Sequence, residues 1–257
     1  MPLLPIHTTG ESDEYDNLCG NLSGTSSFIA GTSVYITKRK SGKNGAGVCR
    51  LHCLPGVIHI FGTGHSVGLG LDIKGRPGSL VPIHIMDMND FVFKGGIPLA
   101  QFKDKKDIFE RRAGVAQKLY DLYAIRPQDI FIVISNSGIN GIAIDIAQLA
   151  RDQGHTVIVV TSMQHTLAEK SRHPSGKKLY ELGTIVIDHC GPHGDALLET
   201  DGKAKICSVS SICNNIIAQS VAARACEILS ERGEDIPVLT TDERHNAALR
   251  KIYEGRI

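Results

Sequence analysis

Residues 130–143, IFIVISNSGINGIA, contain the change of pattern from which the rest of the fold can be predicted. The first five residues are apolar and mostly β-branched, which is typical of a strand buried on both faces of a parallel sheet. From Ile142 the apolar residues follow helical spacing, with Ile146 and Leu149 on the same side. Residues 135–141 are therefore predicted to form a turn between a strand and a helix.

The residues of this turn are small, polar and uncharged. A single serine or asparagine would be enough to cap the helix. Two serines, two asparagines and a glycine within six positions exceed that need. The free N–H groups and the dipole at a helix N-terminus favour an anion there. The turn therefore predicts an anion-binding site.

Two further strands end in similar turns. Residues 57–61 run into Gly62-Thr63-Gly64-His65-Ser66, and residues 156–160 run into Thr161-Ser162. A fourth apolar strand is predicted at 184–188. Strands that alternate with helices over short connections predict a parallel sheet covered on both faces. Because ligands bind beyond the carboxyl ends of such strands, we expect the three turns to meet at one edge.

The other elements are predicted from apolar spacing and from glycine and proline content. Gly68, Gly70, Gly75, Pro77 and Gly78 make a helix over 67–78 unfavourable. The remaining expected elements are a strand at 80–86, an amphipathic helix at 107–124, a polar loop at 189–195, a helix capped by Ser210 or Ser211 that ends near Arg232, and a helix at 242–253.

Composition excludes several classes of protein. The formal net charge is +1, so no global field favours nucleic acid or an anionic membrane. No apolar run reaches the ~18 residues that suggest a membrane span, and no secretory signal pattern is visible. Seven cysteines without a tight framework predict reduced thiols. We therefore expect a soluble cytoplasmic protein.

Residues 1–55 form an atypical N-terminal segment, rich in glycine, serine, threonine and asparagine. Residues 33–37 could form a short strand, or the whole segment could be a loosely packed arm. Cys49, His52 and Cys53 raise the question of zinc. A structural site needs four ligands, and no second pair follows at suitable spacing, so no metal is predicted.

Nucleotide-binding motifs are incomplete. Gly62-x-Gly64 matches the start of a dinucleotide fingerprint, and Asp87 stands about where an acidic residue would follow. The third glycine is absent, because Val67 occupies its position. The lysine of a P-loop is also missing. The sequence therefore predicts no nucleotide cofactor.

Taken together, the turns at 62–66, 135–140 and 161–162 resemble the sugar isomerase (SIS) domain, a phosphosugar-binding fold. The runs SRHPSGKKL at 171–179 and CGPHGDA at 190–196, with the ending His245-Asn246, are similar to a bacterial SIS subgroup described as phosphosugar isomerases. The resemblance covers 57–257. It implies that residues 56–257 form one SIS domain, a three-layer α-β-α sandwich with a parallel, flavodoxin-like sheet.

The resemblance also implies roles for particular residues. Family members often have threonine or serine where Asn140 stands, and an amide can still donate a hydrogen bond. Arg172, His173 and Lys177 could form a positive rim. The residues that would bind the sugar phosphate are Ser66, Ser135, Asn136, Ser137, Gly138 and Asn140, with Thr161 and Ser162 at the border.

Aldose–ketose isomerisation needs a base that moves a proton between adjacent carbons and a group that polarises the carbonyl. Histidines and carboxylates suit both roles near pH 7. The subgroup has a second histidine and a glutamate pair after the first glycine turn, where this chain has Val67, Leu71 and Asp72. The candidate catalytic residues are His65, Asp72, His193, Glu199 and His245, with Asp195 also considered.

The resemblance favours an aldose–ketose isomerase that acts on a sugar phosphate without metal or cofactor. Two alternatives stay open, a non-catalytic sugar-phosphate sensor and an etherase or deaminase on an amino-sugar phosphate. The shortened carboxylate at Asp72 favours the sensor, whereas the retained histidines favour an enzyme. The apolar stripe at 211–232 suggests a homodimer, as family members bury helices between subunits.

Overall fold

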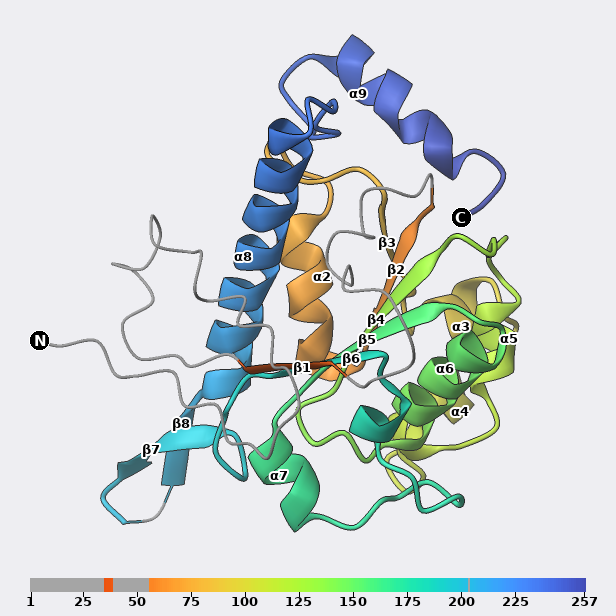
Figure 1. Cartoon of the computed structure of the whole chain (residues 1–257). Helices are drawn as coiled ribbons and strands as arrows, with labels where there is room; N and C mark the ends of the chain where they lie inside the picture. The colour runs from red at the N-terminus through yellow and green to blue at the C-terminus, as the bar shows by residue number, and fades with distance from the viewer. Residues whose placement is uncertain (1–34, 39–55, 203) are drawn as a thin grey trace, which may run out of the picture.

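Six strands form one sheet in the order β1-β6-β5-β4-β2-β3 (Figure 1). The structure is a computed structural model that describes residues 35–38, 56–202 and 204–257. Strands β2 to β6 are mutually parallel, and β1 runs antiparallel to β6. The strands are β1 (Tyr35–Lys38), β2 (Ile58–Gly62), β3 (Ile83–Ile85), β4 (Ile130–Ile134), β5 (Thr156–Thr161) and β6 (Ile185–Asp188).

The sheet reverses its direction of growth at β2. The chain passes from β2 to β3 on one side and then returns to β4 on the other side of β2. The five parallel strands therefore follow the flavodoxin-like order, which confirms the predicted topology. At the carboxyl ends of β2 and β4, Gly62 lies opposite Ile134. The switch point of the sheet therefore lies between the turns that follow these two strands.

Helices cover both faces of the sheet, which confirms the three-layer architecture (Figure 1). Alternate residues of β4 point to opposite faces, so Phe131 and Val133 belong to one apolar core and Ile132 to the other. The first core packs against α5 (Ala116–Tyr120) and α6 (Gly141–Asp152). The second packs against α2 (Gly68–Ile73) and α8 (Val209–Glu231).

The sequence predicts one continuous helix over 107–124, and this prediction is wrong. This segment forms η3 (Phe109–Arg111) and then the short helix α5. Gly114 separates the two with a φ of +78°, a left-handed conformation that no α-helix continues through. Its N–H donates to Asp145 Oδ2 at 2.6 Å, outside its own segment. The apolar spacing arises because Phe109, Ala116 and Leu119 all enter the same core.

The helix considered unfavourable over 67–78 is present in its first half. Residues 64–67 form the 3-10 turn η2, and α2 follows directly. A β-carbon on Gly70 would lie 3.0 Å from Ile60 Cγ2, so glycine lets α2 pack closely on β2. Tertiary packing therefore outweighs the low helix propensity of glycine here.

A hairpin that was not predicted follows the loop at 189–195. Strands β7 (Ala196–Thr200) and β8 (Ala204–Ser208) pair antiparallel, and α8 begins immediately afterwards. The predicted cap at Ser210 or Ser211 is wrong, because Asp195 Oδ1 instead accepts from the Ser210 N–H at 2.7 Å. The remaining elements are α3 (Asp90–Phe93), α4 (Leu99–Phe102), α7 (Met163–Ala168), η4 (Leu179–Leu182), α9 (Glu243–Arg250) and η5 (Lys251–Tyr253).

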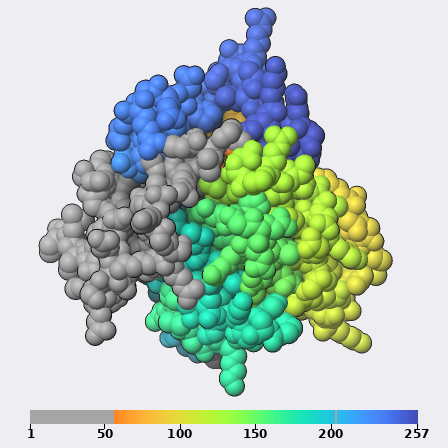
Figure 2. All heavy atoms as spheres, turned by 45° about the vertical axis from the view of Figure 1, so that its right-hand side comes forward, coloured from red at the N-terminus to blue at the C-terminus, as the bar shows by residue number. Residues whose placement is uncertain are grey.

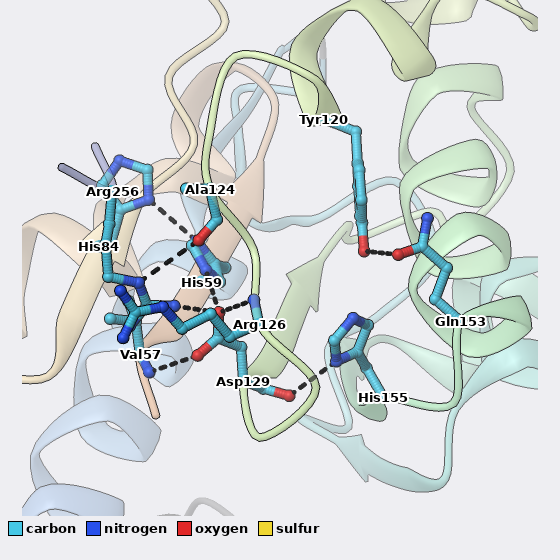
Figure 3. Close-up of polar contacts among 10 residues, drawn as sticks. All are labelled: Val57, His59, His84, Tyr120, Ala124, Arg126, Asp129, Gln153, His155 and Arg256. Atoms are coloured by element: carbon cyan, nitrogen blue, oxygen red, sulfur yellow. Dashed lines mark hydrogen bonds and ion pairs between the residues drawn. The ribbon is translucent and has the colours of Figure 1, made fainter. Parts of the chain in front are cut away.

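A buried polar network ties the C-terminus to the amino edge of the sheet (Figure 3). The buried Asp129, just before β4, forms an ion pair with the buried Arg256. Asp129 also accepts from the Val57 N–H at 2.8 Å, and its Oδ2 lies 3.3 Å from His59 Nε2. His59 Nδ1 is 3.0 Å from Nδ1 of the buried His84. This network lies at the edge opposite the three turns.

The structure bears on two features considered from composition, membrane spans and cysteines, only for the residues that it describes. Among the described residues, no helix is both long and apolar enough to cross a bilayer. The four described cysteines, Cys190, Cys207, Cys213 and Cys226, are free thiols. Cys49, His52 and Cys53, where zinc was considered, lie outside the described residues.

Candidate functional site at the carboxyl edge of the sheet

The turns that follow β4, β5 and β6 are joined by backbone hydrogen bonds. The Ser135 N–H donates to Val160 O at 3.0 Å, and the Ser162 N–H donates to Asn136 O at 3.1 Å. The His189 N–H likewise donates to Thr161 O at 3.0 Å. Of the three turns that the sequence predicts at this edge, those after β4 and β5 therefore adjoin one another. The turn after β2 lies beside the turn after β4, because Gly62 pairs with Ile134 at the ends of these strands.

The loop after β4 has a shape that its own residues enforce. The Gly138 N–H donates to Ser135 Oγ at 3.1 Å, which closes a tight turn. Gly138 has a φ of +62°. A β-carbon there would lie 2.8 Å from Thr166 Oγ1 and 3.0 Å from Thr161 Oγ1. The loop therefore requires glycine for both its backbone conformation and its close packing.

The hydroxyls of Thr161 and Ser162 are fully buried and used within the protein. Thr161 Oγ1 lies 2.9 Å from Thr166 Oγ1 and donates to Asn136 O at 3.2 Å. Ser162 Oγ accepts from the His165 N–H at 3.0 Å, capping α7, and donates to Gly191 O at 2.6 Å. These two residues hold neighbouring loops together and present no hydroxyl to solvent.

Ser66, Asn136 and Ser137 are the predicted phosphate-binding residues whose side chains remain partly exposed. Ser135 is buried, like Thr161 and Ser162. Asn140 is also buried, and its amide joins two charged groups. Its Nδ2 donates to Glu110 Oε1 at 3.2 Å, and its Oδ1 accepts from Arg172 Nη1 at 2.7 Å.

The predicted basic rim lies along α6 and is held by polar partners. Arg172 is bound to Asn140 at the start of the helix. His173 Nε2 lies 2.8 Å from Asp145 Oδ1, and Lys177 Nζ donates to Gln148 Oε1 at 3.1 Å. Arg172 is therefore the cation of this rim that lies at the N-terminus of α6.

Two of the five predicted catalytic residues lie at the carboxyl edge. His65 is exposed on η2, directly before Ser66. His193 lies in the loop after β6, with its Nε2 2.9 Å from Glu169 Oε1. Each follows a strand end, as the sequence pattern predicted.

The structure places the other three elsewhere. Asp72 on α2 accepts from Arg76 at 3.1 Å and from Gln219 of α8. Glu199 is on the exposed hairpin, paired with Lys205 at 3.4 Å, and its side chain is 68% exposed. His245 on α9 contacts Val238 O at 3.1 Å, where Val238 pairs with Leu80 before β3. Figures 1 and 2 show α9 at the opposite end of the molecule from α7 and the residues that follow it, 163–178.

Sequence reasoning missed His165 and Glu169, which lie beside His193. The side chains of these three residues offer ligand atoms that all lie within 4.8 Å of one another. Burial lowers the pKa of His165, while the hydrogen bond to His193 lowers the pKa of Glu169. The spacing of four residues between His165 and Glu169, directly after the Thr161-Ser162 turn, was the signal available in the sequence.

Comparisons with known proteins place the chain in a family. The family model for the SIS domain matches residues 52–162. A UPF0309 protein of Listeria monocytogenes serotype 4b is 36% identical over 208 residues, which are 79% of this chain and 82% of that protein. A UPF0309 protein of Geobacillus kaustophilus is 31% identical over 208 residues, 79% of this chain and 80% of that protein.

Solved structures resemble the chain at low sequence identity. The Vibrio vulnificus NanR protein complexed with ManNAc-6P has a TM-score of 0.42 and 15% identity, over 80% of this chain and 59% of that one. E. coli CFT073 c3406 in complex with A5P has a TM-score of 0.42 and 14% identity, over 78% of this chain and 80% of that one. On its sequence relatives and its domain match, the chain belongs to the UPF0309 family and carries an SIS domain.

Proposed function

We propose that this protein binds a sugar phosphate in the crevice between the turns after β2 and β4. One observation carries the proposal. The turn after β4, built from Ser135 to Asn140 at the N-terminus of α6, lies at the switch point of the sheet. Ligands of doubly wound sheets bind at that position, and helix N-termini favour anions.

The phosphate in this proposal is held by the partly exposed polar side chains. Ser66 would donate from one side of the crevice, and Asn136 and Ser137 from the other. Ser135 and Gly138 set the shape of the loop, and Thr161 and Ser162 anchor it to β5 and β6. Asn140 contributes through Arg172, which it holds near the start of α6.

We further propose that the bound sugar phosphate undergoes aldose–ketose isomerisation. The reaction needs a group that takes a proton from one carbon and returns it to the next. His65 suits this role because it is exposed and adjacent to Ser66, so it would lie beside a bound sugar. Glu199 and His245 are outside this crevice and take no part in the proposed reaction.

A non-catalytic sugar-phosphate sensor is the second candidate. The carboxylate of Asp72 supports it, because Arg76 and Gln219 already bind both of its oxygens. A protein with the phosphate loop, in which neither a carboxylate nor His65 acts as the base, would bind the sugar without converting it. An etherase or deaminase on an amino-sugar phosphate would use the same phosphate site.

NMR of the protein with hexose, heptose and N-acetylamino-sugar 6-phosphates in D₂O separates these functions. An isomerase produces the second isomer and incorporates solvent deuterium at the carbon that receives the transferred proton. A sensor shifts ligand resonances without new products, and an etherase or deaminase releases lactate or ammonia. If no sugar phosphate shifts or turns over, the proposal is wrong.

We also propose that the protein is a cytoplasmic homodimer. The stripe on α8 that suggested a dimer packs mainly within the chain, since Ile217, Ala225 and Leu229 are buried in the monomer. Apolar side chains instead remain exposed on the hairpin and the start of α8, at Leu197, Leu198, Ile206 and Ile212. Exposed apolar side chains on a hairpin and the adjoining helix are candidates for an interface.

Light scattering after size exclusion tests the homodimer. The wild-type protein should elute with twice the chain mass of 27.7 kDa. The double variant Leu198→Ser and Ile206→Ser should elute as a monomer. A monomeric wild-type protein would contradict the proposal, and a dimeric double variant would place the interface elsewhere.

A further inference from the structure

We propose that His165, Glu169 and His193 form a binding site for one divalent transition-metal ion such as Zn²⁺. The sequence alone did not bring these residues together, because His193 lies 24 positions from Glu169 in the chain. His165 lies on α7, and Glu169 is the residue that ends this helix. His193 approaches them from the loop after β6. Two imidazoles and one carboxylate match the ligand set of open zinc sites.

The three side chains converge closely enough to share an ion. Their ligand atoms lie within 4.8 Å of one another, and His193 Nε2 is 2.9 Å from Glu169 Oε1. The rings of His165 and His193 have centroids 4.8 Å apart. Ligands on a tetrahedral Zn²⁺ with bonds of about 2.0–2.1 Å lie roughly 3.3 Å apart. Side-chain rotations alone could close the remaining gap.

The chemical types of the three side chains suit a cation. Imidazole nitrogens and carboxylate oxygens are among the usual protein ligands of Zn²⁺. Such groups bind a metal in their deprotonated forms, so Zn²⁺ binding would displace any proton that the three ligand atoms carry.

Asn136 supplies an outer partner for His165. Its Nδ2 lies 3.3 Å from His165 Nδ1, while its buried Oδ1 has no hydrogen-bond partner. Rotating the amide by 180° would bring Oδ1 to His165 Nδ1, which would then carry the proton. The longer contact from the Gly194 N–H, at 3.4 Å, would be lost. His165 Nε2 would be free for the metal, as in sites where an oxygen orients the ligating histidine.

The proposed site is open on one side. The side chain of His193 is 53% exposed and that of Glu169 is 39% exposed. Three protein ligands leave at least one coordination position for water or for an oxygen of a small molecule. Because Asn136 also belongs to the loop after β4, a bound metal would lie beside the crevice of the proposed sugar-phosphate site.

Zn²⁺ titration of the EDTA-treated, dialysed full chain by calorimetry tests this proposal, without any sugar phosphate present. We expect one Zn²⁺ per chain, and at least tenfold weaker binding in each of His165→Gln, Glu169→Gln and His193→Gln. His245→Gln is the matched control, since it removes an exposed histidine at the opposite edge. Its affinity should equal that of the wild type.

A Cys49→Ser, Cys53→Ser variant controls for zinc binding through the N-terminal segment, and it should bind as the wild type does. Circular dichroism checks that every variant is folded. The proposal is overturned if the wild type binds no Zn²⁺ at micromolar concentration, if the three site variants bind unchanged, or if the cysteine variant loses binding. Sugar-phosphate binding by the EDTA-treated protein is measured separately, so the two proposals can fail independently.

Discussion

Gly138 shows how a single residue determines the shape of the candidate site. Its φ of +62° belongs to the left-handed region, where a side chain costs about 1–2 kcal/mol. It also lies against the hydroxyls of Thr161 and Thr166, which leave no room for a β-carbon. The loop after β4 can therefore keep its position only with glycine at this site.

We expect Gly138→Ala to lower the free energy of unfolding by at least about 1 kcal/mol more than Gly154→Ala does. Gly154 is the matched control because it has a φ of +83° with open space around its α-carbon. Urea denaturation of both variants measures the difference. Equal losses would mean that the contacts with Thr161 and Thr166 do not constrain the loop.

At the residue scale, the sequence predicted the turn of the candidate site better than it predicted the burial of the individual side chains. The density of serine, asparagine and glycine at 135–140 correctly indicated a tight turn before a helix. It could not distinguish Ser135, which is buried against Gly138, from the partly exposed Ser137. Burial depends on neighbours that are distant in the sequence, such as Val160 of β5, whose carbonyl accepts from the Ser135 N–H. His165 and Glu169 were missed for the same reason.

At the scale of elements, the short helix α7 connects three loops of the site. Its cap Ser162 donates to Gly191 in the loop after β6, and its N–H donates to Asn136 in the loop after β4. The Met163 N–H donates to Asp188 Oδ1 at 3.0 Å, at the end of β6. The start of α7 therefore determines how His193 lies relative to Asn136.

Ser162→Ala should lower the free energy of unfolding by about 2 kcal/mol or more. The variant loses a helix cap worth about 1 kcal/mol and leaves the buried Gly191 carbonyl without its partner, at about 1–3 kcal/mol. Asp242→Ala, which removes the cap of α9 from the Arg244 N–H, is the control and should cost about 1 kcal/mol. Amide hydrogen exchange in residues 189–195 should become faster in Ser162→Ala and stay unchanged in Asp242→Ala. Unchanged exchange in Ser162→Ala would show that Ser162 does not hold this loop.

Elements were predictable where local pattern and tertiary packing agree. The run of β4 is apolar throughout, that of β5 is apolar between its two terminal threonines, and both form strands with buried apolar residues. Asp242 caps α9 as an N-cap residue should. The helix over 107–124 failed because side chains of a broken segment can enter one core at helix-like spacing. The helix α2 was not predicted, because its glycines lower helix propensity. In the folded structure Gly70 allows α2 to pack closely against β2, a contact that the sequence alone does not reveal.

At the scale of the whole molecule, the network at the amino edge couples stability to pH (Figure 3). Burial and the neighbouring His59 lower the pKa of His84 to about 3. A histidine in the unfolded chain has a pKa of about 6.5. The unfolded state therefore binds more protons than the folded state between these values. The stabilisation is fully present above pH 6.5 and is lost as the pH falls toward 3.

The wild-type free energy of unfolding should therefore decrease by up to about 1.4 kcal/mol per pH unit from His84 alone between pH 6 and 4. His84→Gln removes the titrating group while keeping an amide that can donate to His59 Nδ1. Urea denaturation at several pH values should give a shallower slope for this variant. Parallel slopes for the two proteins would show that His84 does not carry this dependence.

The strand pattern predicted a parallel sheet covered on both faces, because alternation of buried strands with helices leaves few arrangements. The flavodoxin-like strand order was implied by the resemblance to the SIS domain. The hairpin at 196–208 was not predictable in this way. Its residues are exposed along both strands, so no burial pattern marks it. The network of Asp129, His59, His84 and Arg256 also escapes sequence reasoning, since it joins residues up to 127 positions apart.

The central claim is that the crevice between the turns after β2 and β4 binds a sugar phosphate. Calorimetric titration with the sugar 6-phosphates, for wild type, Ser137→Ala and Ser230→Ala, tests it most directly. Ser230 is an exposed serine near the C-terminal end of α8, away from the site. We predict binding to the wild type, unchanged binding to Ser230→Ala and at least fivefold weaker binding to Ser137→Ala. Equal affinity of all three proteins, or no binding to any, would contradict the claim.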